Sequence, residues 1–442
     1  MKHIAVLFSI FLAIALFVYF YEYRGQEVRE EAGNLGESLL RLKQDEIRSV
    51  EISRPDKDAI RIQKEGDGWA IKKPIETMAD GSLVDSLLRN LEEARRERTF
   101  TAVQGEVEKY GFQEPRMKLK VQTEGDPKTL LVGLDDFTGS NMYVQVEGVP
   151  EVFLTSDQLF TLADKELSDW RSKKILIFER SQVRAIEITA PTQQIHLTKQ
   201  GDNWVLESPI QEKADQSSVS NLLSKLEFAE AQEFVSETGE DLRSHGLDQP
   251  SVSIRIQHQD EDSWRTLEFG NKQGETYLAH NPDRSPVFTV KEDVFQSLIE
   301  EVWQYRDKDV VDVEQDEVIQ LTILGNESEI ALRREESKWI VEKPREQKDK
   351  EALSYKFWYP IDDLKFESIE SSTSSEFPEP DVSVVVTLKD GSTRTFEFVK
   401  SGDQYLARRA DSGRRGTLSQ ESFEKIQLKV EDIVEADVPV AG

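Results

Sequence analysis

The chain has 442 residues, and this length predicts roughly two to four domains rather than a single core. Hydrophobic residues make up 37% of it, enough to bury real cores, so wholesale disorder is not expected. The 85 acidic and 56 basic residues leave a net charge of −29, which repels phosphate backbones, so no nucleic-acid partner is expected. A solvated, self-repelling surface explains the charge, with a cation-binding surface as the alternative. The absence of cysteine excludes disulfides, thiolate metal sites and thiol nucleophiles.

The N-terminus begins with an apolar run from Ile4 to Tyr21. Its 18 residues would reach about 27 Å as a helix, close to the thickness of a hydrocarbon core. A cleavable signal peptide would end in a small-x-small site, but the small pair Ala13 and Ala15 lies in mid-run and bulky aromatic residues end it. Residues 1–21 therefore predict an uncleaved transmembrane signal anchor, and a membrane is the first expected partner.

The residues that flank the anchor predict its orientation. Lys2 and His3 make the short tail positive, so the tail is expected in the cytoplasm and the body outside it. The expected location is the inner (cytoplasmic) membrane, single-pass, with the body in the periplasm of a Gram-negative cell. Residues 22–45 are predicted to form a polar stalk, in which Leu35, Leu39, Leu40 and Leu42 indicate one short helix.

The body repeats itself with a period of 135 residues. The motif Trp-x-x-x-x-Pro occurs at Trp69–Pro74, Trp204–Pro209 and Trp339–Pro344, and Tyr110-Gly111 recurs as His245-Gly246. Such a unit is long enough to be a domain, unlike the short repeats of solenoids. The sequence therefore predicts repeat domains at 46–175, 176–310 and 311–435, the third of them divergent.

Periodicity within a unit predicts an α+β fold, mostly antiparallel. In the first unit, alternation of apolar and polar residues predicts strands around 50–52, 60–62, 69–71, 117–122, 129–133, 142–146 and 152–154. Asp80 is expected to cap a helix with an apolar stripe of leucines, and Asp215 repeats it. A closing helix is predicted from Ser156 to about Leu167.

The third unit departs from this pattern. In place of the leucine stripe it has Tyr355, Phe357, Trp358, Tyr359 and Pro360, which predict a shorter or irregular helix. These aromatic residues indicate either a specialised surface or a core of different shape.

No catalytic, cofactor-binding or metal-binding residue is singled out, and no cofactor is expected. The five histidines show no HxH or HxxxH spacing, and no Walker, Rossmann or nucleophile-elbow motif occurs. His245 is expected to have a packing role because Tyr110 occupies its place in the first unit. Carboxylate pairs such as Asp135–Asp136 and Asp362–Asp363 are too common in an acidic chain to indicate catalysis.

The tryptophan–proline motif has two interpretations. Aromatic side chains line sugar and quaternary-amine sites, but a tryptophan recurring on a strand before a helix would also cover a small core. Its fixed place in each unit favours the structural interpretation.

The order of W-x-[ILV]-x-x-P, the aspartate-led leucine helix and the later [YH]-G-[FL]-x-x-P resembles the bacterial domain-of-unknown-function family 4340 (DUF4340). The resemblance covers nearly the whole body and is clearest over residues 46–310. It implies no established reaction and no catalytic residues. It does imply association with ABC-2-type export systems, including those linked to gliding motility.

Three functions remain open. The first is a non-enzymatic, membrane-anchored extracytoplasmic scaffold or accessory subunit, contacting ABC-transporter permease or ATPase components or other envelope proteins. The second is an extracytoplasmic module that binds glycan or peptide through aromatic residues between units. The third is a carboxylate-dependent glycan hydrolase.

Overall fold

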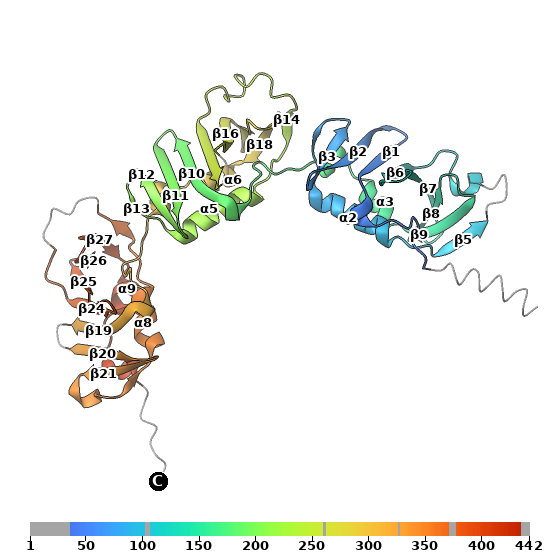
Figure 1. Cartoon of the computed structure of the whole chain (residues 1–442). Coiled ribbons are helices and arrows are strands. Elements are labelled where there is room, and N and C mark those ends of the chain that lie inside the picture. Colours follow the sequence, from blue (N-terminus) through green and yellow to red (C-terminus); the bar gives the residue numbers. More distant parts are fainter. Residues whose placement is uncertain (1–35, 102–106, 260–261, 326–327, 371–376, 435–442) are drawn as a thin grey trace, which may run out of the picture. The chain divides into compact units, whose positions relative to one another are not determined.

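The computed structural model describes residues 36–101, 107–259, 262–325, 328–370 and 377–434 (Figure 1). The chain divides into two compact units, Met1–Lys174 and Ile175–Gly442. The first unit contains one nine-stranded sheet and the second contains two. The α+β class and the threefold repeat are thus confirmed.

The predicted anchor at residues 1–21 lies outside the described residues. Among the residues that are described, no helix is long and apolar enough to cross a membrane.

The first sheet has the strand order β4-β3-β2-β1-β6-β7-β8-β9-β5, with antiparallel pairing between neighbours. Its strands are β1 (Ser49–Arg54), β2 (Lys57–Glu65), β3 (Gly68–Lys73), β4 (Thr77–Met78), β5 (Arg98–Thr101), β6 (Met117–Gln122), β7 (Lys128–Asp135), β8 (Asn141–Val146) and β9 (Glu151–Ser156). Its helices are α2 (Gly81–Glu93), α3 (Gln158–Ala163) and α4 (Leu167–Trp170), with 3-10 turns η1 (Gln44–Glu46) and η2 (Val107–Tyr110).

The second sheet repeats this order as β13-β12-β11-β10-β15-β16-β17-β18-β14. Its strands are β10 (Val183–Ala190), β11 (Gln193–Gln200), β12 (Asn203–Ser208), β13 (Glu212–Lys213), β14 (Phe234–Ser236), β15 (Val252–His258), β16 (Trp264–Gln273), β17 (Thr276–His280) and β18 (Val287–Lys291). Its helices are α5 (Gln216–Phe228), α6 (Glu292–Leu298) and α7 (Val302–Tyr305), with the 3-10 turn η3 (Arg180–Gln182).

The third sheet has the order β22-β21-β20-β19-β24-β25-β26-β27-β23, the same topology again. Its strands are β19 (Val318–Gly325), β20 (Glu329–Glu335), β21 (Lys338–Lys343), β22 (Glu351–Ala352), β23 (Ser368–Ile369), β24 (Val382–Leu388), β25 (Thr393–Ser401), β26 (Gln404–Arg409) and β27 (Arg415–Leu418). Its helices are α8 (Ser354–Asp362), α9 (Gln420–Lys425) and α10 (Val430–Ile433), with 3-10 turns η4 (Gln315–Glu317) and η5 (Arg345–Gln347).

The predicted helix caps are confirmed. The Asp80 carboxylate accepts a hydrogen bond from the amide of Leu83 at 2.9 Å, and Asp215 accepts one from Ser218 at 2.9 Å. Each bond satisfies a donor that the first helical turn leaves without a partner. The leucine and valine stripes of α2 and α5 are buried against the sheets, as their spacing predicts.

The helix of the third repeat is shorter, as predicted. α8 has nine residues where α2 and α5 have 13 each, and Pro360 lies inside it. Phe357 and Trp358 are buried, and Trp339 meets Phe357 edge-on with ring centroids 5.5 Å apart. These two aromatic residues therefore fill a core of different shape, whereas Tyr355 and Tyr359 are exposed.

The tryptophan–proline motif is built into the cores. Trp204 and Trp339 are buried and Trp69 is half-buried, and they lie on the equivalent strands β12, β21 and β3. Each of the three prolines follows a cis peptide bond. The buried indole rings bear out the structural interpretation of the motif.

The described part of the predicted stalk is wrong, because residues 36–45 belong to the first domain. Leu39, Leu40 and Leu42 lie in its core, and the amide of Leu39 donates to the carbonyl of Ala94 at 2.8 Å. No helix forms over 36–43, and the 3-10 turn η1 follows. The leucine spacing reflects burial under a sheet rather than a separate amphipathic helix.

Equivalent bonds start the other two repeats. The amide of Ile175 donates to Ala229 at 3.3 Å, and that of Val310 donates to Leu364 at 2.9 Å. We call 36–43, 172–179 and 307–314 the lead-in segments. The first repeat therefore includes residues that were predicted to belong to the stalk.

The single closing helix predicted near 156–167 is also wrong, because two short helices, α3 and α4, replace it. After α4 the chain returns to the start of the long helix, where the amide of Asp80 donates to the Trp170 carbonyl at 2.7 Å. Asp215 and Tyr305 repeat this bond at 2.9 Å. These bonds attach the closing segment of each repeat to the start of the long helix of the same repeat. They thereby also position the next residue of the chain, Arg171 or Arg306.

Gly270 lies at a bulge in β16 where another segment passes very close. A Cβ atom there would stand 2.3 Å from the carbonyl oxygen of His245, which accepts a hydrogen bond from Asn271 at 2.9 Å. Gly133 has the same relation to Tyr110 in the first repeat. The main chain of His245 is thus tightly packed here, and the packing role expected of its side chain stays a prediction.

We expect Gly270→Ala to lower the free energy of unfolding of the second repeat by about 1–3 kcal/mol, because the new methyl group would displace the His245 backbone. Gly81→Ala is the matched control, since a Cβ there meets no atom within 4 Å. Urea denaturation of both variants measures the effect. Equal stability of the two would show that the close approach is absent.

Candidate functional site

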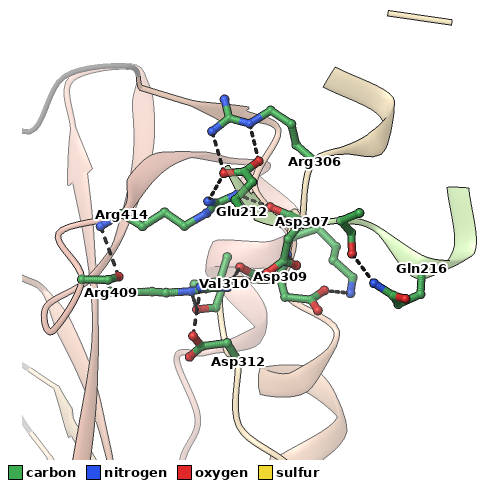
Figure 2. Close-up of polar contacts among 12 residues, drawn as sticks. Glu212, Gln216, Arg306, Asp307, Asp309, Val310, Asp312, Arg409 and Arg414 are labelled. Carbon is green, nitrogen blue, oxygen red and sulfur yellow. Dashed lines mark hydrogen bonds and ion pairs between the residues drawn. The ribbon is translucent and has the colours of Figure 1, made fainter. Parts of the chain in front are cut away.

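The most elaborate polar site lies within the second unit, where the second and third sheets meet (Figure 2). Glu212 comes from the edge strand β13, Arg306 follows α7, and Arg414 stands in the turn between β26 and β27. A bridge between Ala214 and Arg306 holds the closing segment beside β13, so Arg306 faces Glu212. We use the name junction for the charged residues of this region, which are Glu212, Arg306, Asp307, Asp309, Asp312, Arg409 and Arg414.

Glu212 is the central acceptor of the junction. Arg306 binds it through two nitrogens, Nε to Oε1 at 2.7 Å and Nη2 to Oε2 at 3.1 Å. Arg414 of the third repeat donates from Nη1 to Oε2 at 2.6 Å. The three side chains are only 11%, 12% and 15% exposed for Glu212, Arg306 and Arg414. The Glu212 carboxylate therefore accepts a bidentate pair of hydrogen bonds from Arg306 and a further one from Arg414. Such charge-assisted hydrogen bonds are strong.

A second arginine of the same hairpin anchors the lead-in segment. Arg409 is buried and donates from Nε to the Val310 carbonyl at 3.1 Å and from Nη2 to the Asp309 carbonyl at 2.6 Å. It also pairs with the Asp312 carboxylate at 2.9 Å and with that of Asp307 at 3.3 Å. One guanidinium thus satisfies two main-chain acceptors and two carboxylates.

The connection between the two repeats is very short. Arg306 is still fixed to the second sheet, while Asp309 already forms a bridge with Lys365 of the third. Arg414 also donates to the main-chain carbonyl of Asp307. The backbone of the connection is therefore held by residues of both repeats.

Burial and charge shift the pKa values of the junction in opposite directions. Burial alone would raise the pKa of Glu212, but hydrogen bonds from Arg306 and Arg414 outweigh it and hold that pKa below its ordinary value of 4.5. Burial raises the pKa of Asp307 above its ordinary value, since the nearby Arg409 only partly compensates. Glu212 is consequently the group whose ionisation favours the folded junction.

We expect the stabilising effect of Glu212 to be fully present above pH 4.5, the ordinary value, and to fade as the pH falls through its lower folded-state pKa. The reason is that the unfolded chain takes up the proton first. The difference in unfolding free energy between the wild type and Glu212→Gln measures this, because the contribution of Asp307 cancels to first order. A difference that stays constant down to the acid limit would contradict the assignment.

The junction is not a feature that all repeats share. In the register of the sheets, Thr77 of the first repeat stands where Glu212 stands in the second. Asn281 takes the place of Arg409 and donates to the Ile175 carbonyl at 3.5 Å. The neutral amide of Asn281 thus makes the lead-in contact that the Arg409 guanidinium makes in the third repeat.

The carboxylate pairs considered from the sequence lie apart from the junction. The Asp136 carboxylate accepts hydrogen bonds from Thr138 and Gly139 in a turn, and Asp135 pairs with Arg116 at 2.8 Å. Asp362 and Asp363 are exposed at the end of α8. Over the described ranges, no group of three or more His, Cys, Asp or Glu residues is placed to hold a metal ion.

Sequence reasoning missed the junction. One signal was present: Arg408, Arg409, Arg414 and Arg415 lie within eight residues of an otherwise acidic chain. Such a basic run in a chain of net charge −29 predicts a local acidic counterpart. It does not identify which of the 85 acidic residues that counterpart is.

The sequence profile of the domain of unknown function DUF4340 matches residues 69–236 and, overlapping them, 204–380. The chain belongs to the DUF4340 family. Each match begins at the tryptophan of the motif, Trp69 or Trp204, so the family unit has the same phase as the repeat. The description of the family assigns no activity, and it therefore leaves function to be argued from the repeats and the junction.

Other comparisons add little to the DUF4340 assignment. No curated protein matches the chain. Among solved structures, a DnaN sliding clamp (DNA polymerase III subunit beta) from Pseudomonas aeruginosa bound to griselimycin is 7% identical, covers 87% of this chain and 94% of its own, and has a TM-score of 0.14. A likeness at that level supports no inference.

Proposed function

We propose that this DUF4340 chain is a non-enzymatic, membrane-anchored extracytoplasmic scaffold or accessory subunit that works beside an ABC-type transport system. The observation that carries the proposal is the use of charge at the junction. Arg414 of the third repeat binds the Glu212 carboxylate of the second, Arg306 holds that carboxylate from within its own repeat, and Arg409 binds the main-chain carbonyl of Asp309 in the connection. The most elaborate polar site of the described chain is thus occupied in joining two domains.

The repeat supports the same proposal. Three copies of one α+β domain place similar surfaces along a single chain, an arrangement suited to contacting several partners. The linker between the second and third repeats is short and is bonded to both of them. Such a linker suits a fixed connection between domains better than a hinge that opens and closes around a substrate. The apolar run Ile4–Tyr21 supplies the expected membrane anchor, and the ABC-2-type export setting that the family resemblance implies suggests the partner.

Two fusions test the membrane placement. Alkaline phosphatase joined after Gly442 is expected to be active in cells, whereas a green fluorescent protein that folds only in the cytoplasm is expected to stay dark. The full chain should remain in the membrane pellet after carbonate washing, and removal of residues 1–24 together should release it. A fluorescent C-terminal fusion, or release of the full chain by carbonate, would contradict the placement.

A further inference from the structure

One face of α8 in the third repeat is exposed and aromatic. Tyr355 and Tyr359 are 55% and 61% exposed and lie four residues apart, so they are neighbours on one face of the helix. Their counterparts are Ser82 and Ser86 in α2, counted from the residue that receives the closing segment. The pair is not a core requirement of the fold, because the adjacent Phe357 and Trp358 already fill the core.

Carboxylates continue this face toward the end of the helix. Asp362 and Asp363 follow Tyr359 by three and four residues and are exposed. Partial desolvation of the Asp362 carboxyl against the helix end, and then the negative charges of Asp309, Glu314 and Asp363, raise its pKa despite Lys365. The C-terminal end of a helix adds a negative partial charge of its own.

The helices that contact α8 carry more acidic than basic side chains. α10 carries exposed Glu431 and Asp432, and α9 carries exposed Glu424. The exposed Lys425 of α9 pairs with Glu421 at 3.0 Å, and Lys365 pairs with Asp309. Lys425 and Lys365 also act on the carboxylates of this end, Lys425 on Asp363 and Lys365 on Asp362, and Lys356 of α8 is a further basic side chain, so the acidic charge is reduced but remains in excess.

From this geometry we propose that the face formed by Tyr355, Tyr359, Asp362 and Asp363 binds an arginine-containing segment of a partner protein. Phenol rings attract guanidinium groups over their faces, and the carboxylates accept their hydrogen bonds. Charge complementarity selects this occupant over an anionic lipid or an acidic peptide, which the same carboxylates repel. The inference rests on the proposed scaffold function and names the chemistry of its partner.

The probe is an acetylated Gly-Arg-Gly-Arg-Gly-Arg amide, titrated calorimetrically into the full chain held in phosphatidylcholine nanodiscs. We expect measurable binding that weakens as salt rises. The double variant Tyr355→Ser/Tyr359→Ser should weaken it at least about fivefold, since each exposed cation–π contact contributes a factor of roughly two to five. Asp362→Asn/Asp363→Asn should weaken it similarly and flatten the salt dependence.

Matched controls separate the face from the general acidity of the chain. Asp56→Asn/Asp58→Asn removes the same charge from the exposed β1–β2 hairpin of the first unit, and Phe137→Ser removes an exposed ring from that unit. Both should bind the peptide as the wild type does. Equal binding by all variants would overturn the proposal, as would binding of a neutral oligosaccharide that depends on the tyrosines but not on the aspartates. If a membrane complex is recovered and Tyr355→Ser/Tyr359→Ser leaves it intact, the binding role of this face would be refuted. The proposed scaffold function would stand in that case.

Discussion

Replacing Glu212 by alanine should lower the free energy of unfolding of the junction by about 3 kcal/mol, the largest single effect we expect from a polar residue in this chain. Most of this loss comes from the two arginines that keep their charge without a carboxylate partner, and less from the missing hydrogen bonds. Arg306 and Arg414 would be left facing each other in a shielded site without the carboxylate that both now bind. Because all three side chains are slightly exposed to solvent, we expect a loss of unfolding free energy at the lower end of the range for broken buried ion pairs.

Hydrogen exchange measured by mass spectrometry over a urea series would follow this loss in the full chain, because it reports each sheet separately. Peptides covering β13 and the β26–β27 hairpin should lose protection together, and those of the first unit should not change. Glu329→Ala is the matched control, since its pair with Lys343 is exposed and contributes at most about 1 kcal/mol. A loss no larger than that of the control would show that the junction contributes no more than a surface pair.

Replacing Trp358 by alanine should destabilise the third repeat by about 3–5 kcal/mol. The side chain is 2% exposed in a core shared with Phe357 and Ile361, so its removal leaves a cavity that the short helix cannot close. Urea denaturation of the full chain, followed by exchange at β21 and β24, would measure it. Tyr359→Ala, on the exposed side of the same helix, should change stability by less than about 0.5 kcal/mol.

The two results together decide how the aromatic run of the third repeat is used. A large loss for Trp358 and a negligible one for Tyr359 would separate a core role from a surface role within one helix. Similar losses for both variants would mean that α8 packs on both of its sides, and the proposed binding face would not exist.

Local and repeated features could be predicted from the sequence. The strands follow from alternating burial, as in β6, where Met117, Leu119 and Val121 are buried and the lysines between them are exposed. Asp80 and Asp215 could be identified as caps because capping depends on a few neighbouring residues. Because the units repeat every 135 residues, a strand or helix predicted in one unit could be predicted at the equivalent position of the next.

The lead-in segments were missed because their burial is set by distant strands. Leu39 and Leu40 carry no strong local pattern, and proximity to the anchor made a stalk the simpler interpretation. Aligning them with Ile175-Leu176 and Val310-Val311, which begin the later repeats, would have placed them in the core. Position within the repeat was the better guide than local polarity.

The junction could not be found from the sequence for a different reason. Glu212 and Arg414 are 202 residues apart, and neither belongs to a motif. Their meeting depends on how two sheets dock, which is a property of shape and linker length. Only the arginine run at 408–415 indicated that a counterpart existed.

Purification from native membranes tests most directly whether this DUF4340 chain is the scaffold of a membrane complex. The tagged full chain, extracted in mild detergent, should bring down a membrane transport permease in a fixed ratio that survives size-exclusion chromatography. The Glu212→Ala variant should recover less of it. Recovery of the chain alone in repeated preparations, with the wild type folded and in the membrane fraction, would contradict the claim.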